Sequence, residues 1–203
     1  MKKLLFAGFV VLVTAFNRLP DEGLTKSERS FAVDYLKKTE SRLRKDVQGL
    51  SSDQLNFKAD SSRWSVAQCV EHITLAENLI WKWSQGMLSQ PANPSKRGEI
   101  KFSNEQLIAA TVDRSKKFNA PDVLKPDNKL GSTEDALKIF TQRRDSTITY
   151  IQTTQDDLKN HFIIHPAMGT LDLYQALLFL SAHCERHTLQ LEEVKANPNF
   201  PKN

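Results

Sequence analysis

Apolar residues recur every three to four positions along most of this chain, and this period is typical of amphipathic helices. In one such segment, Val66, Ile73, Ile80 and Trp83 fall on the same side of a helix. No segment alternates convincingly with a period of two, so strands are not expected. The pattern predicts four long helices, over 25–49, 65–87, 132–157 and 171–196, and a weaker fifth helix over 103–118.

Residues that favour a helix start stand at the N-terminal ends of three of these predicted helices. Thr25 and Ser65 are each followed three residues later by Glu or Gln, which is the spacing of a capping box. Thr170 is the expected N-cap of the last helix, and a turn is expected before it, over 160–169. The residue types at the predicted boundaries therefore agree with the apolar period.

Helices that each carry one apolar stripe bury those stripes best against one another. We therefore expect an all-α fold, an antiparallel four-helix bundle with an extra short helix, formed by one domain over 25–203. The connection between the second and third long helices is extended, so the pattern leaves open whether the wiring is up-down-up-down. Its segments 88–102 and 119–131 contain two prolines each and are expected to shape substrate choice.

The composition is that of a globular protein, with 39% hydrophobic and 26% charged residues among 203. The formal net charge is +4, and no block of five or six like charges occurs. A nucleic-acid-binding surface is therefore not expected. The sequence lacks a P-loop, a Ser-x-x-Lys motif and a glycine-rich dinucleotide signature, which argues against those enzyme classes.

The first residues have the features of a secretory signal peptide. Two lysines precede an uncharged run of 13 residues, Leu4 to Phe16, whereas a membrane span needs about 20. We predict a signal peptide over 1–15, a linker over 16–24, and an exported protein, periplasmic or secreted, with no stable membrane domain. Cleavage after Ala15 would leave a net charge of (28 − 2) − 24 = +2. An uncleaved anchor, or an apolar helix packed on the domain, is the alternative.

Two histidines near the end of the chain have the spacing of a metal-binding pair. His183 and His187 are four residues apart, so both side chains leave a helix on the same face. His72, on the apolar side of the second predicted helix, is the candidate third ligand, and three protein ligands leave a position for water. Cys184 stands where an HExxH protease has Glu, which excludes a zincin. Buried core histidines are the alternative, and spacing alone does not decide.

Three short stretches resemble motifs of the DinB/YfiT-like family. They are RWSVAQCVEHI from Arg63 to Ile73, HPAMGTL from His165 to Leu171, and HCERHTLQ from His183 to Gln190. Their order and their separation match the family, and the resemblance runs over about 25–196. Each motif is weak alone, and the three together are fairly specific.

The resemblance implies a four-helix bundle that holds a metal with three histidines, matching His72, His183 and His187. The metal would be divalent, with zinc or nickel preferred and manganese or iron possible as alternatives. It also implies a small-molecule substrate and a homodimer. Relatives are described as metal-dependent hydrolases, and some use a thiol, such as bacillithiol S-transferase and mycothiol-dependent maleylpyruvate isomerase.

Export favours hydrolysis over thiol transfer, because a cytosolic thiol would be scarce outside the cytoplasm. A metal-binding or stress-associated bundle without catalysis is the alternative function. Cys69 and Cys184 are expected as buried free thiols, with a disulfide between them as the alternative. Four further polar residues are candidates for contacts to the imidazole rings, to substrate or to neighbouring helices: Glu71, His165, Glu185 and Arg186.

Overall fold

The structure is a computed structural model that describes residues 23–202. The predicted signal peptide and most of the predicted linker therefore lie outside the described residues. Within 23–202, every helix is too short or too polar to cross a lipid bilayer. The four long helices are α1 (Lys26–Val47), α3 (Val66–Leu88), α5 (Thr133–Thr153) and α6 (Leu173–Lys195).

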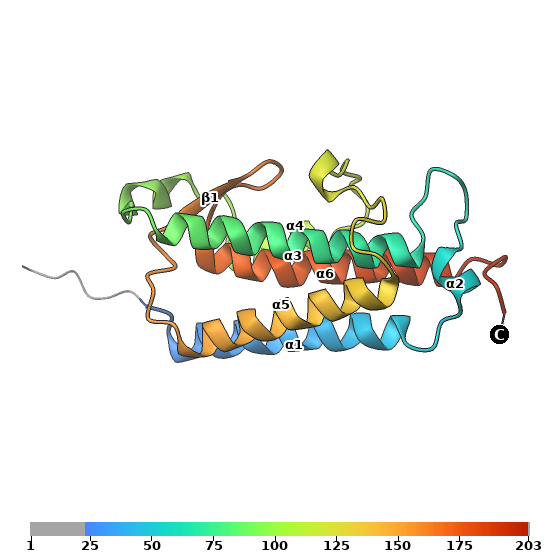
Figure 1. The fold of residues 1–203 in the computed structure, drawn as a ribbon. Helices are drawn as coiled ribbons and strands as arrows, with labels where there is room; N and C mark the ends of the chain where they lie inside the picture. The colour runs from blue at the N-terminus through green and yellow to red at the C-terminus, as the bar shows by residue number, and fades with distance from the viewer. Residues whose placement is uncertain (1–22, 203) are drawn as a thin grey trace, which may run out of the picture.

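The long helices form a four-membered bundle, which confirms the predicted all-α fold (Figure 1). α1 packs against α5 and α6, and α3 packs against the same two helices. The chain direction in Figure 1 shows that α3 runs antiparallel to α6 and parallel to α5. This wiring is not up-down-up-down, because the long connection from α3 returns the chain to the end where α3 began.

That connection contains three short helices. They are η1 (Pro94–Glu99), α4 (Asn104–Val112) and η2 (Asp122–Leu124). α4 packs on α6 and is shorter than the helix predicted over 103–118. η2 contacts α3, so the connection crosses back over the groove between α3 and α6. A further one-turn helix, α2 (Ser52–Asn56), precedes α3.

Helix starts follow the predicted capping chemistry with one exception. Thr25 and Ser65 form complete capping boxes at α1 and α3, as expected. The N-cap of α6 is Asp172, so the prediction of Thr170 is wrong. Thr170 instead lies in a strand, and its backbone pairs with Ile164.

The expectation of no strands is also wrong for the turn before α6. β1 (Phe162–His165) and β2 (Gly169–Asp172) form an antiparallel hairpin, and Gly169 has the positive φ of 76° that a tight turn favours. Four-residue strands show too few alternations to stand out from a sequence. Ile163 is buried and Ile164 is 69% exposed, although both are apolar.

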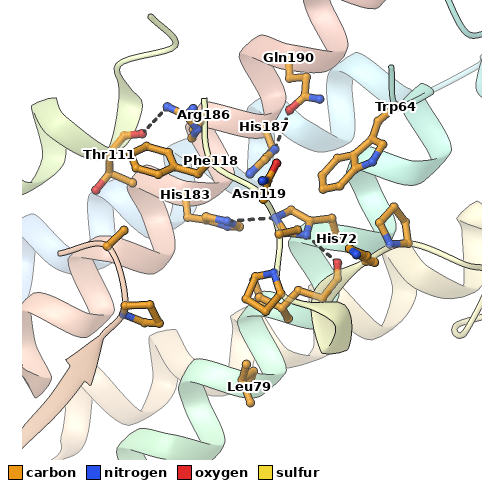
Figure 2. A pocket seen from close by; sticks show the side chains of 18 of the residues that line it. Trp64, His72, Leu79, Thr111, Phe118, Asn119, His183, Arg186, His187 and Gln190 are labelled. Atoms are coloured by element: carbon orange, nitrogen blue, oxygen red, sulfur yellow. Dashed lines mark hydrogen bonds between the residues drawn. The ribbon is translucent and has the colours of Figure 1, made fainter. Parts of the chain in front are cut away.

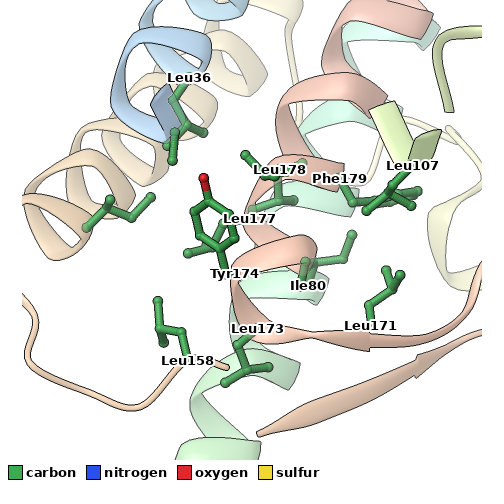
Figure 3. Packing of buried hydrophobic residues seen from close by; sticks show 14 of the residues in the cluster. Leu36, Ile80, Leu107, Leu158, Leu171, Leu173, Tyr174, Leu177, Leu178 and Phe179 are labelled. Atoms are coloured by element: carbon green, nitrogen blue, oxygen red, sulfur yellow. The ribbon is translucent and has the colours of Figure 1, made fainter. Parts of the chain in front are cut away.

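α6 is the central helix of the core. Its first half is buried on nearly all sides because α1, α3 and α4 all pack against it. Figure 3 shows Leu173, Leu177 and Leu178 of α6 among side chains of these neighbours, including Leu36 and Ile80. The second half of α6 is held by the same neighbours, and this half carries the two histidines.

Candidate metal centre

Three histidines meet in the groove between α3 and α6. His72 comes from α3, and His183 and His187 come from consecutive turns of α6. One nitrogen from each ring lies within 4.8 Å of the other two, which is a grouping that could hold a metal ion. Figure 2 shows the three rings turned toward one another. The structure therefore brings together the three residues that the sequence singled out.

The hydrogen bond of His72 fixes which of its nitrogens carries the proton. His72 Nδ1 lies 2.8 Å from the carbonyl oxygen of Leu124, the last residue of η2. A carbonyl oxygen can only accept, so Nδ1 donates and Nε2 carries the lone pair. That lone pair faces His183 Nε2 at 3.2 Å. Two nitrogens at this distance require a proton or a cation between them.

A chain of contacts fixes the proton of His187 in the same way. His187 Nδ1 lies 2.9 Å from Oε1 of Gln190, and the Arg114 guanidinium donates to the same Oε1 at 3.1 Å. A guanidinium can only donate, so this atom is the amide oxygen and His187 Nδ1 is its second donor. Arg114 is itself held by a bidentate ion pair with Glu193. The lone pair of His187 is therefore also on Nε2.

The surroundings keep the three imidazoles neutral. Burial lowers the pKa of His72 and lowers those of His183 and His187 well below the usual value. Part of the cover is the Trp64 ring, whose centroid lies 4.7 Å from that of His72 and 5.9 Å from that of His187. Neutral imidazole is the form of histidine that binds metals.

The spacing of the nitrogens fits a shared ion. Two imidazole nitrogens about 2.1 Å from one zinc ion, at the roughly 109° of a tetrahedral site, are about 3.4 Å apart. His72 Nε2 and His183 Nε2 are 3.2 Å apart. The hydrogen-bonded Nδ1 atoms of His72 and His187 also match metal sites, where the second ring nitrogen donates to an outer acceptor.

The histidines lie in the wall of a pocket of about 1410 Å³. Its other walls are contributed by α3 and the segment before it, by α6, by the hairpin turn and by the connection from Thr111 to Pro126. Of the two connecting segments expected to shape substrate choice, 119–131 lines the pocket and 88–102 does not. Asn119 belongs to this connection and is a polar lining residue that the sequence did not single out (Figure 2).

His165 also lines the pocket, and its proton is on the opposite nitrogen. Its Nδ1 accepts from the backbone N–H groups of Ala167 and Met168, both at 3.2 Å. Nε2 must therefore carry the proton, which makes His165 a hydrogen-bond donor rather than a fourth metal ligand. Burial lowers the pKa of His165 to about 4, and its ring packs 4.4 Å from Phe179.

Two of the candidate residues, Glu71 and Glu185, make no contact with the imidazole N–H groups. Glu71 instead accepts from two backbone N–H groups in the loop after η2. Glu185 accepts from Tyr35 and from Arg42 on the far side of α6. The side-chain acceptor is Gln190, which is three residues after His187 and so could have been found from helical spacing. The other acceptor, the backbone carbonyl of Leu124 that holds His72, leaves no such signal in a sequence.

The remaining candidates have structural partners. Arg186 donates to backbone carbonyls of Thr111, Asp113 and Lys116 and so holds the connection after α4 in place. Cys69 and Cys184 are buried free thiols, as expected from the sequence, and neither lines the pocket. Burial raises the pKa of both thiols to about 12.

A helical bundle with three convergent histidines in a pocket between two of its long helices is the class that the fold and the site define. Residues 35–191 match the DinB superfamily, and the chain belongs to that superfamily. It is 25% identical over 150 residues to the uncharacterized protein YuaE of Bacillus subtilis (strain 168), covering 74% of this chain and 88% of that protein.

The fold is similar to that of a solved structure from the same organism. YfiT from Bacillus subtilis is described as a probable metal-dependent hydrolase with an unusual four-helix bundle topology. The TM-score is 0.57 at 17% sequence identity, over 87% of this chain and 91% of that chain. The similarity confirms the four-helix bundle. The predicted DinB/YfiT-like family is confirmed by the match of residues 35–191 to the DinB superfamily.

Proposed function

We propose that this protein is a metal-dependent hydrolase in which His72, His183 and His187 hold one divalent metal ion. The observation that carries the proposal is the convergence of neutral imidazoles in an open pocket, two of them with their lone pairs fixed on Nε2. The description of YfiT as a probable metal-dependent hydrolase supports the same reading. Zinc or nickel suits three imidazoles, and manganese and iron are the alternatives.

A divalent metal held by three imidazoles supplies a Lewis acid and makes a coordinated water or thiol more acidic. The chain's own groups position the reactants around it. Leu124 and Gln190 hold the rings of His72 and His187 at the required rotation. His165 offers its Nε2–H to an oxygen of the substrate, because its Nδ1 is occupied by two backbone donors.

Water is favoured over a thiol as the nucleophile for two reasons. Neither cysteine of the chain lines the pocket, so a thiol would have to be brought by a cofactor. We also propose that the protein is exported, because its first residues have the pattern of a signal peptide. Low-molecular-weight thiols of the cytosol would be scarce there.

A metal-binding bundle without catalysis is the second candidate. It is favoured by one observation, that no Asp or Glu within residues 23–202 lines the pocket. A hydrolase commonly uses a carboxylate as general base, and here water would have to lose its proton to bulk solvent or to a group of the substrate.

The first test is the metal content of protein purified without added metal, measured by elemental analysis. We expect about one divalent ion per chain, lost in His72→Ala and in His187→Ala. His161→Ala is the matched control, because the ring of His161 contacts carbonyls of Asp157 and Gln90 outside the site. Wild-type protein that takes up no zinc, nickel or manganese would show that the histidines are core residues.

The second test separates the two candidates. Metal-loaded protein is screened with chromogenic esters, amides and phosphoesters. Hydrolysis that is lost on chelation, restored by the metal and absent in His183→Ala would support the hydrolase. A full complement of metal with no turnover of any class would favour the non-catalytic bundle.

A further inference from the structure

The charged residues that line the pocket are all of one sign. In the part of the chain that the structure describes, no carboxylate lines the pocket, whereas five cationic side chains do. A wall of one sign raises the local concentration of ligands of the opposite sign. The five are Arg63, Arg114, Lys117, Lys125 and Arg186.

Two of these cations have no carboxylate partner. Arg63, Arg114 and Lys125 are each paired with an acid that does not line the pocket. Among residues 23–202, neither Lys117 nor Arg186 lies within ion-pair distance of a carboxylate. Arg186 is 7% exposed and contacts neutral backbone carbonyls, so its charge is retained next to the histidines. The wall therefore keeps an excess of positive charge.

One end of the pocket is apolar. Leu79, Ile80 and Trp83 follow His72 along α3 by seven to eleven residues, or about 10–16 Å at the rise of an α-helix. Because α6 runs antiparallel to α3, Phe179 lies toward the same end, one turn before His183. Trp83 remains 38% exposed there. Exposed apolar surface in a pocket is typical of a ligand contact.

The opposite end carries two arginines, each of which is paired with an acid. Arg63 precedes the first turn of α3, on the other side of His72 from Trp83. Arg114 is bonded to Gln190 and Glu193, which follow His183 along α6 by seven and ten residues. The three histidines thus lie between the apolar end and these paired arginines. Of the two cations without a carboxylate partner, Arg186 stands between His183 and His187 in the sequence of α6.

We infer that the substrate is an anionic amphiphile, with its apolar group toward Trp83 and Phe179 and its negative group toward the uncompensated charges of Lys117 and Arg186. This inference rests on the proposed function and names its substrate class. The histidines would then lie next to the negative group of the substrate, because Arg186 stands in the same part of α6 as His183 and His187. A neutral or cationic ligand of the same length would not be attracted by the positive charge of the pocket wall.

The test uses metal-free protein, so that the affinity measured is for the pocket wall alone and no metal contributes to it. Octanoate, octan-1-ol and octylammonium, which share one apolar chain, are titrated into the protein by isothermal titration calorimetry at low ionic strength. Two uncompensated charges predict that octanoate binds about tenfold more tightly than octylammonium, with octanol between them. Equal affinity for the three probes, or preference for octylammonium, would overturn the inference.

Matched variants locate the charge. Lys117→Glu should weaken octanoate binding about fivefold, because it reverses a charge on the wall. Lys116→Glu is the control: it makes the same change in net charge one residue away, at an exposed side chain that does not line the pocket. Equal losses in the two variants would contradict a local effect.

A second pair locates the apolar end. Trp83→Ser should weaken octanoate binding about fivefold through lost apolar contact. Phe31→Ser removes an exposed aromatic ring from α1, which does not line the pocket, and should leave binding unchanged. Metal content is measured separately on the same preparations. A protein that binds no metal but prefers octanoate would refute the proposed hydrolase and leave the cationic, anion-binding pocket standing.

Discussion

At the scale of single residues, replacing Gln190 tests whether its hydrogen bond orients the ring of His187. Its amide oxygen receives one hydrogen bond from Arg114 and one from His187. Gln190→Leu removes the acceptor and leaves the ring free to rotate and to move its proton to Nε2. We expect the variant to bind zinc about 10–100-fold more weakly, measured by competition with a chromophoric chelator.

Two controls accompany this substitution. Gln190→Glu keeps an oxygen in place and should retain most of the affinity. Gln152→Leu makes the same chemical change at an exposed position of α5 and should have no effect. If Gln190→Leu binds zinc as tightly as wild type, the proton on His187 is not set by this contact.

How far the site could be predicted follows from where its groups come from. The His183 and His187 pair is local, four residues apart on one helix, so its geometry is readable from the sequence. The sequence places His72 on the apolar side of its helix, but it does not show which helix that side packs against. Only the fold brings His72 next to the pair on α6. The carbonyl of Leu124 could not be predicted, since every residue has one and only the path of the connection places it beside His72.

At the scale of elements, the helix start at Asp172 links the hairpin to the bundle. Asp172 caps α6 and is 6% exposed, and burial raises the pKa of its carboxyl to about 6. In the unfolded chain a carboxyl of this type titrates near 3.9. Between about pH 4 and pH 6 the folded state therefore holds a proton that the unfolded state has lost, so this group destabilises the fold progressively as pH rises.

Asp172→Asn keeps the capping oxygen and removes the buried charge. We expect its stability relative to wild type to increase by about 2 kcal/mol between pH 4.5 and pH 7.5, measured by urea unfolding. Asp53→Asn, at an exposed position of α2, should show no such trend. A difference between Asp172→Asn and wild type that stays constant with pH would contradict the raised pKa.

Long helices were predictable because their apolar period repeats over several turns, and α1, α3, α5 and α6 begin within two residues of the expected starts. The hairpin before α6 was not predictable for the opposite reason. Its strands have four residues each, and their pairing depends on the partner strand and on the turn at Gly169. The direction of α5 likewise depends on the long connection, which has no period to read.

At the scale of the whole molecule, the export proposal makes a separate prediction. If residues 1–15 are a signal peptide, the chain expressed in a bacterial host should be recovered from the periplasm or the medium. Its mass should correspond to a first residue of Phe16. Ala15→Glu, which removes the small residue at the cleavage site, should leave the precursor uncleaved. Recovery of a full-length chain in the cytosol would contradict export and remove one argument against a thiol cofactor.

The proposed metal would join α3 to α6 across the groove, so binding should stabilise the whole bundle. At a free zinc concentration of about 100 times Kd, binding to the folded state alone adds about 2.7 kcal/mol. For a domain of this size that corresponds to a rise in Tm of roughly 5–10 °C. We expect this rise in differential scanning calorimetry for wild type and for His161→Ala, and none for His183→Ala.

The rise in Tm on zinc binding should also depend on pH in a defined direction. Protonation of the imidazoles competes with the metal, so the rise in Tm should shrink as pH falls. Because burial holds the pKa of all three histidines below the usual value, the loss should begin at a lower pH than for an exposed histidine pair. A rise in Tm that persists in His183→Ala would place the ion elsewhere on the molecule. No rise in wild type, at a concentration where elemental analysis finds the ion bound, would show that the unfolded chain binds the ion as tightly as the folded bundle does.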